Sequence, residues 1–285
     1  MQARAVRKAA LSSVGAVLVT FVVALSVSEH NLPASTLSQD TPAHIEQFIA
    51  ALQEQVSSDA STEDLKNAAS DLLSVVQNPL IQKHHQILAD TVLRRLPAGC
   101  RNNLKIFSVL YENAKERGLG GKTTIIIDGS VSDSEFAALI THECGHVISG
   151  NLLGNVRTGK SAFRDGKDIF AKDSPSAAFF ALSWRNEKTF RADANESDFA
   201  SGYALSNAFE DFAETFTLYV LQRPALEARA KENSVMAAKL NWMRKHLPLK
   251  DGALGIPLYS WDGSIPWDAT KLAYGWNPVV MNTQN

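Results

Sequence analysis

The pattern His142-Glu143-Cys144-Gly145-His146 restricts this chain more than any other feature, because its chemistry works only on a helix. Residues i and i+4 share one face of an α-helix, so the two imidazoles can reach one metal ion. Glu143 lies about 60° around the helix from His146, close enough to act on a water at that ion. Cys144 lies about 200° from His142 and is expected to face away from the metal.

The surroundings of this pattern favour a buried helix over a chance match on a surface helix. Ser132 and Glu135 form a capping-box pattern before it, and Gly150 or Gly154 is expected to end it. Apolar residues flank the two histidines at Ala137, Leu139, Ile140, Val147 and Ile148. The context therefore predicts a helix that packs against a core and presents its histidines on one side.

A third ligand has to come from later in the chain. A histidine six residues after His146 would mark one class of zinc peptidases, but position 152 is leucine. A carboxylate is the alternative, and an acid four residues further on could hydrogen-bond a ligand histidine. The carboxylates considered are Glu187, Glu196, Glu210, Glu214 and Glu227. Only Glu210 has such a partner, in Glu214; a solvated acidic face is the alternative reading of this pair.

The segment 202–216 resembles the corresponding stretch of the anthrax lethal factor-like metallopeptidases. That family has a tyrosine seven residues before its ligand glutamate, within an E-x-F-A-E motif, and Tyr203 with Glu210-Asp-Phe-Ala-Glu214 matches it. Gly145 matches the glycine before the family's second histidine. The resemblance covers roughly residues 122–220. It implies a zincin-like fold of the glutamate-ligand (gluzincin) type, and it implies that Tyr203 hydrogen-bonds the oxyanion of the reaction.

We therefore expect a zinc-dependent endopeptidase acting on a peptide or protein substrate. His142, His146 and Glu210 are the expected ligands of one Zn²⁺ per chain, with Glu143 as general base and Tyr203 as a second catalytic group. Glu214 is expected to orient a ligand histidine. The alternative is a non-catalytic zinc-binding extracellular module, although such a module would have no need of Glu143.

The N-terminus predicts export. Arg4, Arg7 and Lys8 precede an apolar run over residues 9–27, which is typical of a signal peptide or an N-terminal membrane anchor. Residues 1–28 are assigned to that segment and 29–41 to a linker. The remaining chain is expected to be secreted, extracytoplasmic or anchored to the membrane. Cys100 and Cys144 could form one disulfide or remain two buried thiols.

The rest of the chain predicts an α+β protein with an N-terminal helical bundle. Residues 42–98 are expected to form three helices, over 42–56, 64–76 and 79–96, which could also act as an interaction or propeptide-like segment. The metallopeptidase domain is assigned to 99–285. It starts with strands in 104–111 and 122–130 around a glycine-rich turn at 117–121, and residues 124–128 are expected to pair with an extended substrate. Helices are predicted over 204–221 and 225–246, and 155–200 reads as irregular.

Composition excludes other classes of function. The 285 residues carry a formal net charge of −2, which offers no general basic surface for a nucleic acid. Hydrophobic residues make up 45% of the chain, so it is neither disordered nor fibrous. The adjacent His84 and His85 point to different faces of a helix and are expected to be structural or solvated.

Overall fold

Residues 72–112 and 114–278 are described by a computed structural model, and they lie within one unit of mixed α+β class. The described part holds seven α-helices: α3 (Lys83–Arg95), α4 (Ala98–Asn103), α5 (Asp133–Asn151), α6 (Pro175–Phe180), α7 (Ala208–Leu221), α8 (Arg223–Glu232) and α9 (Ser234–His246). The predicted signal or anchor (1–28), the linker (29–41) and most of the predicted N-terminal bundle lie outside the described residues. None of the described helices is long and apolar enough to cross a bilayer.

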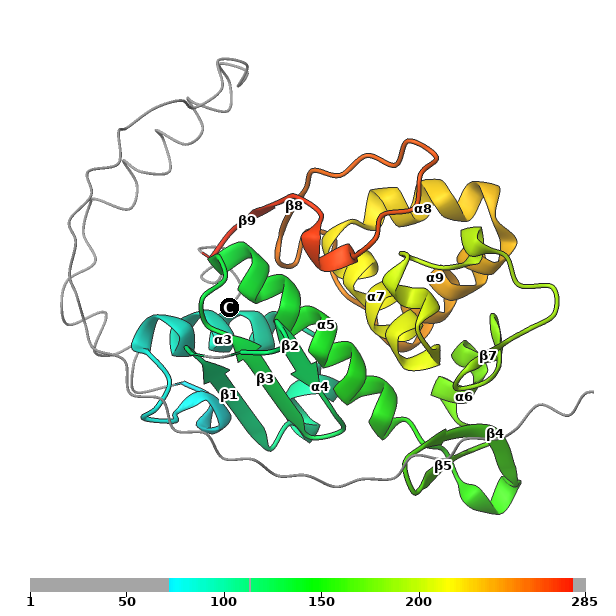
Figure 1. Cartoon of the computed structure of the whole chain (residues 1–285), viewed down its shortest axis with the longest axis horizontal. Coiled ribbons are helices and arrows are strands. Elements are labelled where there is room, and N and C mark those ends of the chain that lie inside the picture. Colours follow the sequence, from blue (N-terminus) through cyan, green and yellow to red (C-terminus); the bar gives the residue numbers. More distant parts are fainter. Residues whose placement is uncertain (1–71, 113, 279–285) are drawn as a thin grey trace, which may run out of the picture. The chain divides into compact units, whose positions relative to one another are not determined.

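A three-stranded sheet lies beside α5 (Figure 1). Its strands are β1 (Ile106–Leu110), β2 (Gly118–Gly120) and β3 (Thr124–Asp128), in the order β1-β3-β2. β3 is parallel to β1 and antiparallel to β2. Both predicted strands are therefore confirmed, but β3 is central and cannot offer a free edge to a substrate. The predicted glycine turn instead contains the edge strand, β2.

α5 packs one face on the sheet and another on α7 (Figure 1). Ser132 caps its first turn by accepting a hydrogen bond from the Glu135 amide at 3.3 Å. The capping box is only half formed, because the Glu135 carboxylate pairs with Arg117 and Lys271 instead of turning back to Ser132. The helix ends at Asn151, between the two predicted glycines.

α7 crosses α5 closely because Gly145 has no side chain. A Cβ at this position would lie 2.8 Å from the Cα of Ala213 on α7, nearer than packed atoms approach. α7 begins at Ala208 and not at 204, since Asn207 is extended and caps the helix. Its Oδ1 accepts hydrogen bonds from the amides of Phe209 and Glu210, at 2.9 and 3.0 Å.

The helix predicted over 225–246 is in fact two helices. Asn233 interrupts it with extended backbone, and its side chain accepts hydrogen bonds from the amides of Val235 and Met236. Asn233 therefore ends α8 and caps α9. The prediction missed this break because apolar residues continue on both sides of Asn233, and both helices bury some of them.

The span 155–200 is more ordered than predicted. It forms two hairpins and a short helix: β4 (Lys160–Asp165) with β5 (Asp168–Ala171), α6, and β6 (Trp184–Asn186) with β7 (Thr189–Phe190). Five of its aromatic residues are buried, at Phe163, Phe170, Phe179, Phe180 and Trp184, and Phe179 packs against α7 and α9. In the tail, β8 (Gly255–Pro257) pairs with β9 (Tyr274–Trp276).

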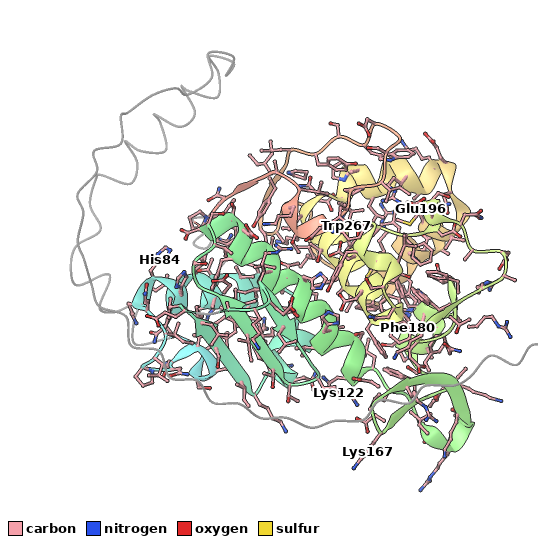
Figure 2. The ribbon with its side chains drawn as sticks, in the orientation of Figure 1. His84, Lys122, Lys167, Phe180, Glu196 and Trp267 are labelled. Carbon is pink, nitrogen blue, oxygen red and sulfur yellow. A yellow bond between two sulfur atoms is a disulfide. The ribbon has the colours of Figure 1, made fainter. Side chains whose placement is uncertain are left out.

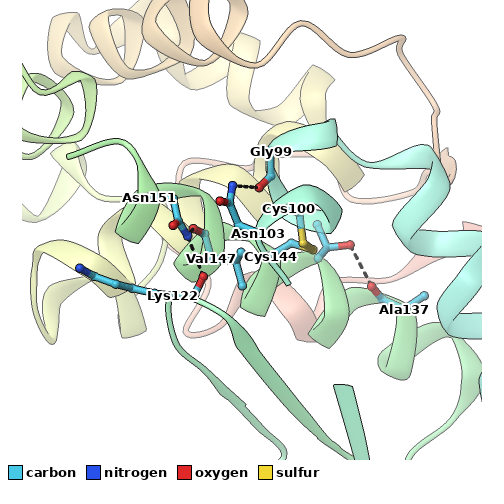
Figure 3. Close-up of a disulfide and its surroundings, with 9 residues drawn as sticks. Gly99, Cys100, Asn103, Lys122, Ala137, Cys144, Val147 and Asn151 are labelled. Atoms are coloured by element: carbon cyan, nitrogen blue, oxygen red, sulfur yellow. Dashed lines mark hydrogen bonds between the residues drawn. A yellow bond between two sulfur atoms is a disulfide. The ribbon is translucent and has the colours of Figure 1, made fainter. Parts of the chain in front are cut away.

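A disulfide joins α4 to the back of α5 (Figure 3). Cys100 and Cys144 are both fully buried, with their Cα atoms 5.3 Å apart. Cys144 faces the side of α5 away from the two histidines, as its helical position predicts. The bridge answers the question that the sequence left open between a disulfide and two thiols.

Candidate metal centre

His142, His146 and Glu210 come together between α5 and α7. One ligand atom of each lies within 4.8 Å of the others, as a group that could hold a metal ion. Among the described residues this is the only such group of histidine, cysteine or acidic side chains. The other carboxylates weighed as a third ligand, Glu187, Glu196 and Glu227, do not join it.

The three side chains already contact each other. Oε2 of Glu210 lies 3.1 Å from Nε2 of His142 and 3.3 Å from Nε2 of His146. Burial alone would raise the pKa of Glu210, but the hydrogen bonds from the two histidines lower it well below its usual range. The carboxylate is therefore ionised at neutral pH, as a metal ligand must be. Its place in the first turn of α7 adds the favourable field of a helix N-terminus.

Glu214 lies behind His142, one helical turn from Glu210. Its Oε1 is 2.8 Å from Nδ1 of His142, and neither buried atom has another partner. The contact is not aligned as an ideal hydrogen bond, yet its length and the lack of other partners indicate that the imidazole N–H points to this carboxylate. Burial would lower the pKa of His142, but the bonds to Glu210 and Glu214 raise it well above its ordinary value. A metal ion that binds here would displace the proton on Nε2, while the proton on Nδ1 would stay directed at Glu214.

Two further residues hold Glu214, and sequence reasoning missed both. Oε2 of Glu214 accepts hydrogen bonds from Oγ of Ser201 at 2.5 Å and from the backbone amide of Ala269 at 2.7 Å. Ser201 lies two residues before Tyr203, and Ala269 lies in the tail, 55 residues after Glu214. A contact made by a backbone amide leaves no signal in residue types. The fully buried Glu214 is thus surrounded by partners rather than solvated.

Glu143 lies under the edge strand of the sheet. It is buried, and a Cβ at Gly118 or at Gly120 would overlap its carboxylate. The glycines at alternate positions of β2 therefore leave the room in which this side chain stands. Burial raises the pKa of Glu143 despite the nearby histidines, and this shift is in the direction that a general base near neutral pH would need.

Tyr203 lies near His142 and belongs to the 3-10 helix η4 (Tyr203–Leu205). Its ring centre is 6.1 Å from that of His142, and the side chain is 39% exposed. Burial, together with the negative charges of Glu210 and Glu143, raises its pKa to about 12. The hydroxyl therefore stays protonated and able to donate a hydrogen bond at physiological pH.

A cleft passes over these residues and along β2. It consists of a cavity of about 450 Å³ and a second of about 170 Å³. The two share five lining residues, Glu116, Gly118, His142, Glu143 and Tyr203, so they are two halves of one cleft. The larger half continues towards Lys122 and the smaller towards Trp267.

The predicted structural role of His84 and His85 agrees with their contacts. His84 lies 2.8 Å from Asp133, and His85 stacks on Phe136 and contacts the hydroxyl of Tyr111.

Comparisons with protein-family models, with curated proteins and with solved structures gave no match to this chain.

Proposed function

We propose that this protein is a zinc-dependent endopeptidase. The observation that carries the proposal is the convergence of two imidazole nitrogens and one carboxylate oxygen within 4.8 Å, with Glu143 and Tyr203 facing the same cleft. A chance pair of histidines on a helix would have no reason to contact both an ionised carboxylate, Glu210, and a second buried carboxylate, Glu214.

The donor set fits zinc. Catalytic zinc sites commonly have three protein ligands of the His₂Glu kind and leave a fourth position open, and this group lies at a cleft. The buried contact between His142 Nδ1 and Glu214 fits as well, because it orients Nε2 towards Glu210, where a metal ion would bind both groups. When bound, zinc would polarise the scissile carbonyl and lower the pKa of water.

The chain's own residues would carry the proton transfers. Glu143 would accept a proton from the attacking water and deliver it to the leaving amine. The protonated hydroxyl of Tyr203 would donate a hydrogen bond to the developing oxyanion. On its outer side β2 has no partner strand within the described sheet, so an extended peptide could pair with its backbone above Glu143.

The shape of the cleft favours an endopeptidase. The lining continues past the ligand group in both directions, towards Lys122 on one side and towards Trp267 on the other. A substrate peptide could therefore lie across the site with residues on both sides of the cleaved bond. The fold proposed for this site is the zincin-like fold that the resemblance to the lethal factor-like metallopeptidases implies.

We also propose that the protein acts outside the cytoplasm, either secreted or held by residues 9–27. The charged and apolar N-terminus supports this proposal. The disulfide Cys100–Cys144 supports it independently, because such bonds persist in oxidising compartments.

Cleavage of an unfolded protein such as casein tests the proposed activity. We expect the zinc-loaded protein to cleave it, and a chelator or Glu143→Gln to abolish cleavage. Glu112→Gln removes a carboxylate from the exposed surface and should cleave normally. Cleavage that survives both the chelator and Glu143→Gln would contradict the proposal, and zinc binding with no cleavage of a broad peptide library would favour the non-catalytic module instead.

A further inference from the structure

Trp267 is a fixed but exposed aromatic side chain at the smaller half of the cleft. It is 74% exposed, more than any other aromatic side chain in the described part of the chain. Figure 2 labels its place in the tail. Its backbone does not move freely, since Tyr203 donates a hydrogen bond to the Trp267 carbonyl and Gly202 to that of Pro266, both at 2.8 Å. The ring lies against Gly202, where a Cβ would overlap it. An indole held open to solvent beside a candidate active site is a surface for a ligand.

Glu116 is a carboxylate of the cleft that has no ion-pair partner among the described residues. It lines both halves, is exposed, and takes part in no ion pair within the described residues. Its neighbour Arg117 is occupied, because that guanidinium pairs with Glu135 at 2.7 Å and with Asp268. The negative charge of Glu116 reaches the site, since it contributes to the raised pKa of Tyr203.

The smaller half of the cleft is rich in carboxylates. Four line it, at Glu116, Glu143, Glu214 and Asp268, beside Arg117 and the proposed zinc ligand His142. Glu214 is occupied by Ser201, Ala269 and His142, and Asp268 by Arg117. Glu143 is the proposed base. Only Glu116 is therefore available to bind a charged group of a ligand.

We propose that Trp267 and Glu116 form a subsite for a basic side chain of the substrate, next to the cleaved bond. This proposal rests on the proposed peptidase function. A lysine or arginine would lay its stem and charge on the indole and pair with the carboxylate of Glu116. An apolar side chain would cover Glu116 and leave it without a partner, and an acidic one would be repelled.

Cleavage rates test the subsite in an active enzyme. Peptides acetylated at the N-terminus would differ at one position beside the cleaved bond, with lysine, arginine, norleucine or glutamate. Norleucine keeps the apolar stem and removes the charge. At the varied position, we expect kcat/KM to be at least tenfold higher for lysine or arginine than for norleucine or glutamate. Glu116→Gln should remove most of that preference, Trp267→Ala should lower the rate for lysine and norleucine alike, and Glu112→Gln should change neither.

A binding measurement tests the same subsite without catalysis. N-acetyl-arginine amide and N-acetyl-norleucine amide would be titrated into the zinc-loaded protein, with tryptophan fluorescence as the signal and Trp267→Phe to assign it. We expect the arginine amide to bind at least tenfold more tightly, and Glu116→Gln to remove that difference.

The two measurements separate the possible failures. An enzyme that cleaves peptides without preference for a basic residue, or keeps the preference in Glu116→Gln, would overturn the subsite and leave the peptidase intact. No cleavage of any peptide, with selective and Glu116-dependent binding of the arginine amide, would overturn the peptidase and keep the subsite.

Discussion

At the residue scale, the contacts of His142 fix the orientation of its imidazole in a group that could hold a metal ion. Its Nδ1 faces Glu214, whose other oxygen is held by Ser201 and Ala269, so the imidazole has little freedom to turn. These supporting contacts come from three separate segments of the chain. Sequence spacing predicted Glu214, because a helix places residues 210 and 214 on one face, but it had no means of predicting Ser201 or a backbone amide in the tail.

Replacing Ser201 with alanine should weaken metal binding. The hydroxyl donates to Glu214 at 2.5 Å, and its loss leaves the carboxylate with one bond fewer to hold it against His142. We expect zinc affinity to fall about 10- to 100-fold, as for other residues that support a metal-ligating histidine. Competition with a chromogenic chelator measures this. Ser206→Ala, an exposed serine on the same segment, is the control, and equal affinities in both variants would contradict the role of Ser201.

Replacing Tyr203 with phenylalanine should lower catalysis without removing zinc. Loss of an oxyanion donor typically costs about 10²–10³ in kcat. Since the pKa of Tyr203 is raised to about 12, its hydroxyl is protonated throughout the usual assay range. The ratio of wild-type to variant rates should therefore be constant between about pH 6 and pH 10. A ratio that falls towards one at the alkaline end would show that the hydroxyl ionises earlier than its environment indicates.

At the scale of elements, the site depends on the crossing of α5 and α7. The helix periods and the capping residue Ser132 could be read from the sequence, so both helices were predicted, whereas the close approach of α7 to Gly145 emerged only from the structure. Element ends were less predictable where an asparagine caps: Asn207 moved the start of α7 and Asn233 divided the last predicted helix. The strand β2 was not predicted, because its two glycines are more typical of a turn. Here they are required by the nearness of Glu143.

A buried ion pair between Asp211 and Lys239 connects α7 with α9. Nζ of Lys239 lies 2.7 Å from both carboxylate oxygens of Asp211, and neither side chain is exposed. Lys239→Met would leave Asp211 buried without its cation, so we expect the free energy of unfolding to fall by about 3–5 kcal/mol. Urea denaturation measures the change. Adding Asp211→Asn should recover part of the loss, whereas a cost below about 1 kcal/mol for Lys239→Met alone would contradict this account.

At the scale of the molecule, the tail completes the site. Residues 266–271 receive hydrogen bonds from Gly202 and Tyr203, donate one to Glu214, and pair with Arg117 and Glu135. The sequence predicted only that the tail would lie on the surface, because none of these contacts has a periodic pattern. The α+β class was predictable, since the strands and helices around the histidines each had a local signal.

The disulfide should contribute much of the stability of the described unit. It closes a loop between residues 44 positions apart, for which the chain-entropy model gives about 4 kcal/mol. We expect the Cys100→Ala, Cys144→Ala double variant to lose about 2–5 kcal/mol in the free energy of unfolding. Chemical denaturation measures the loss, and a difference below about 1 kcal/mol would show that packing around α4 and α5 suffices without the bond.

Metal content is the first measurement to make on the proposed ligand group. Elemental analysis would compare the purified wild-type protein with His142→Ala, Glu210→Ala and, as a control, Glu187→Ala, a carboxylate outside the ligand group. We predict about one zinc per chain in the wild type and in Glu187→Ala, and little or none in the other two variants. Zinc retained by Glu210→Ala would contradict the proposed ligand set, and no zinc in the wild type after supplementation would contradict the metal site itself.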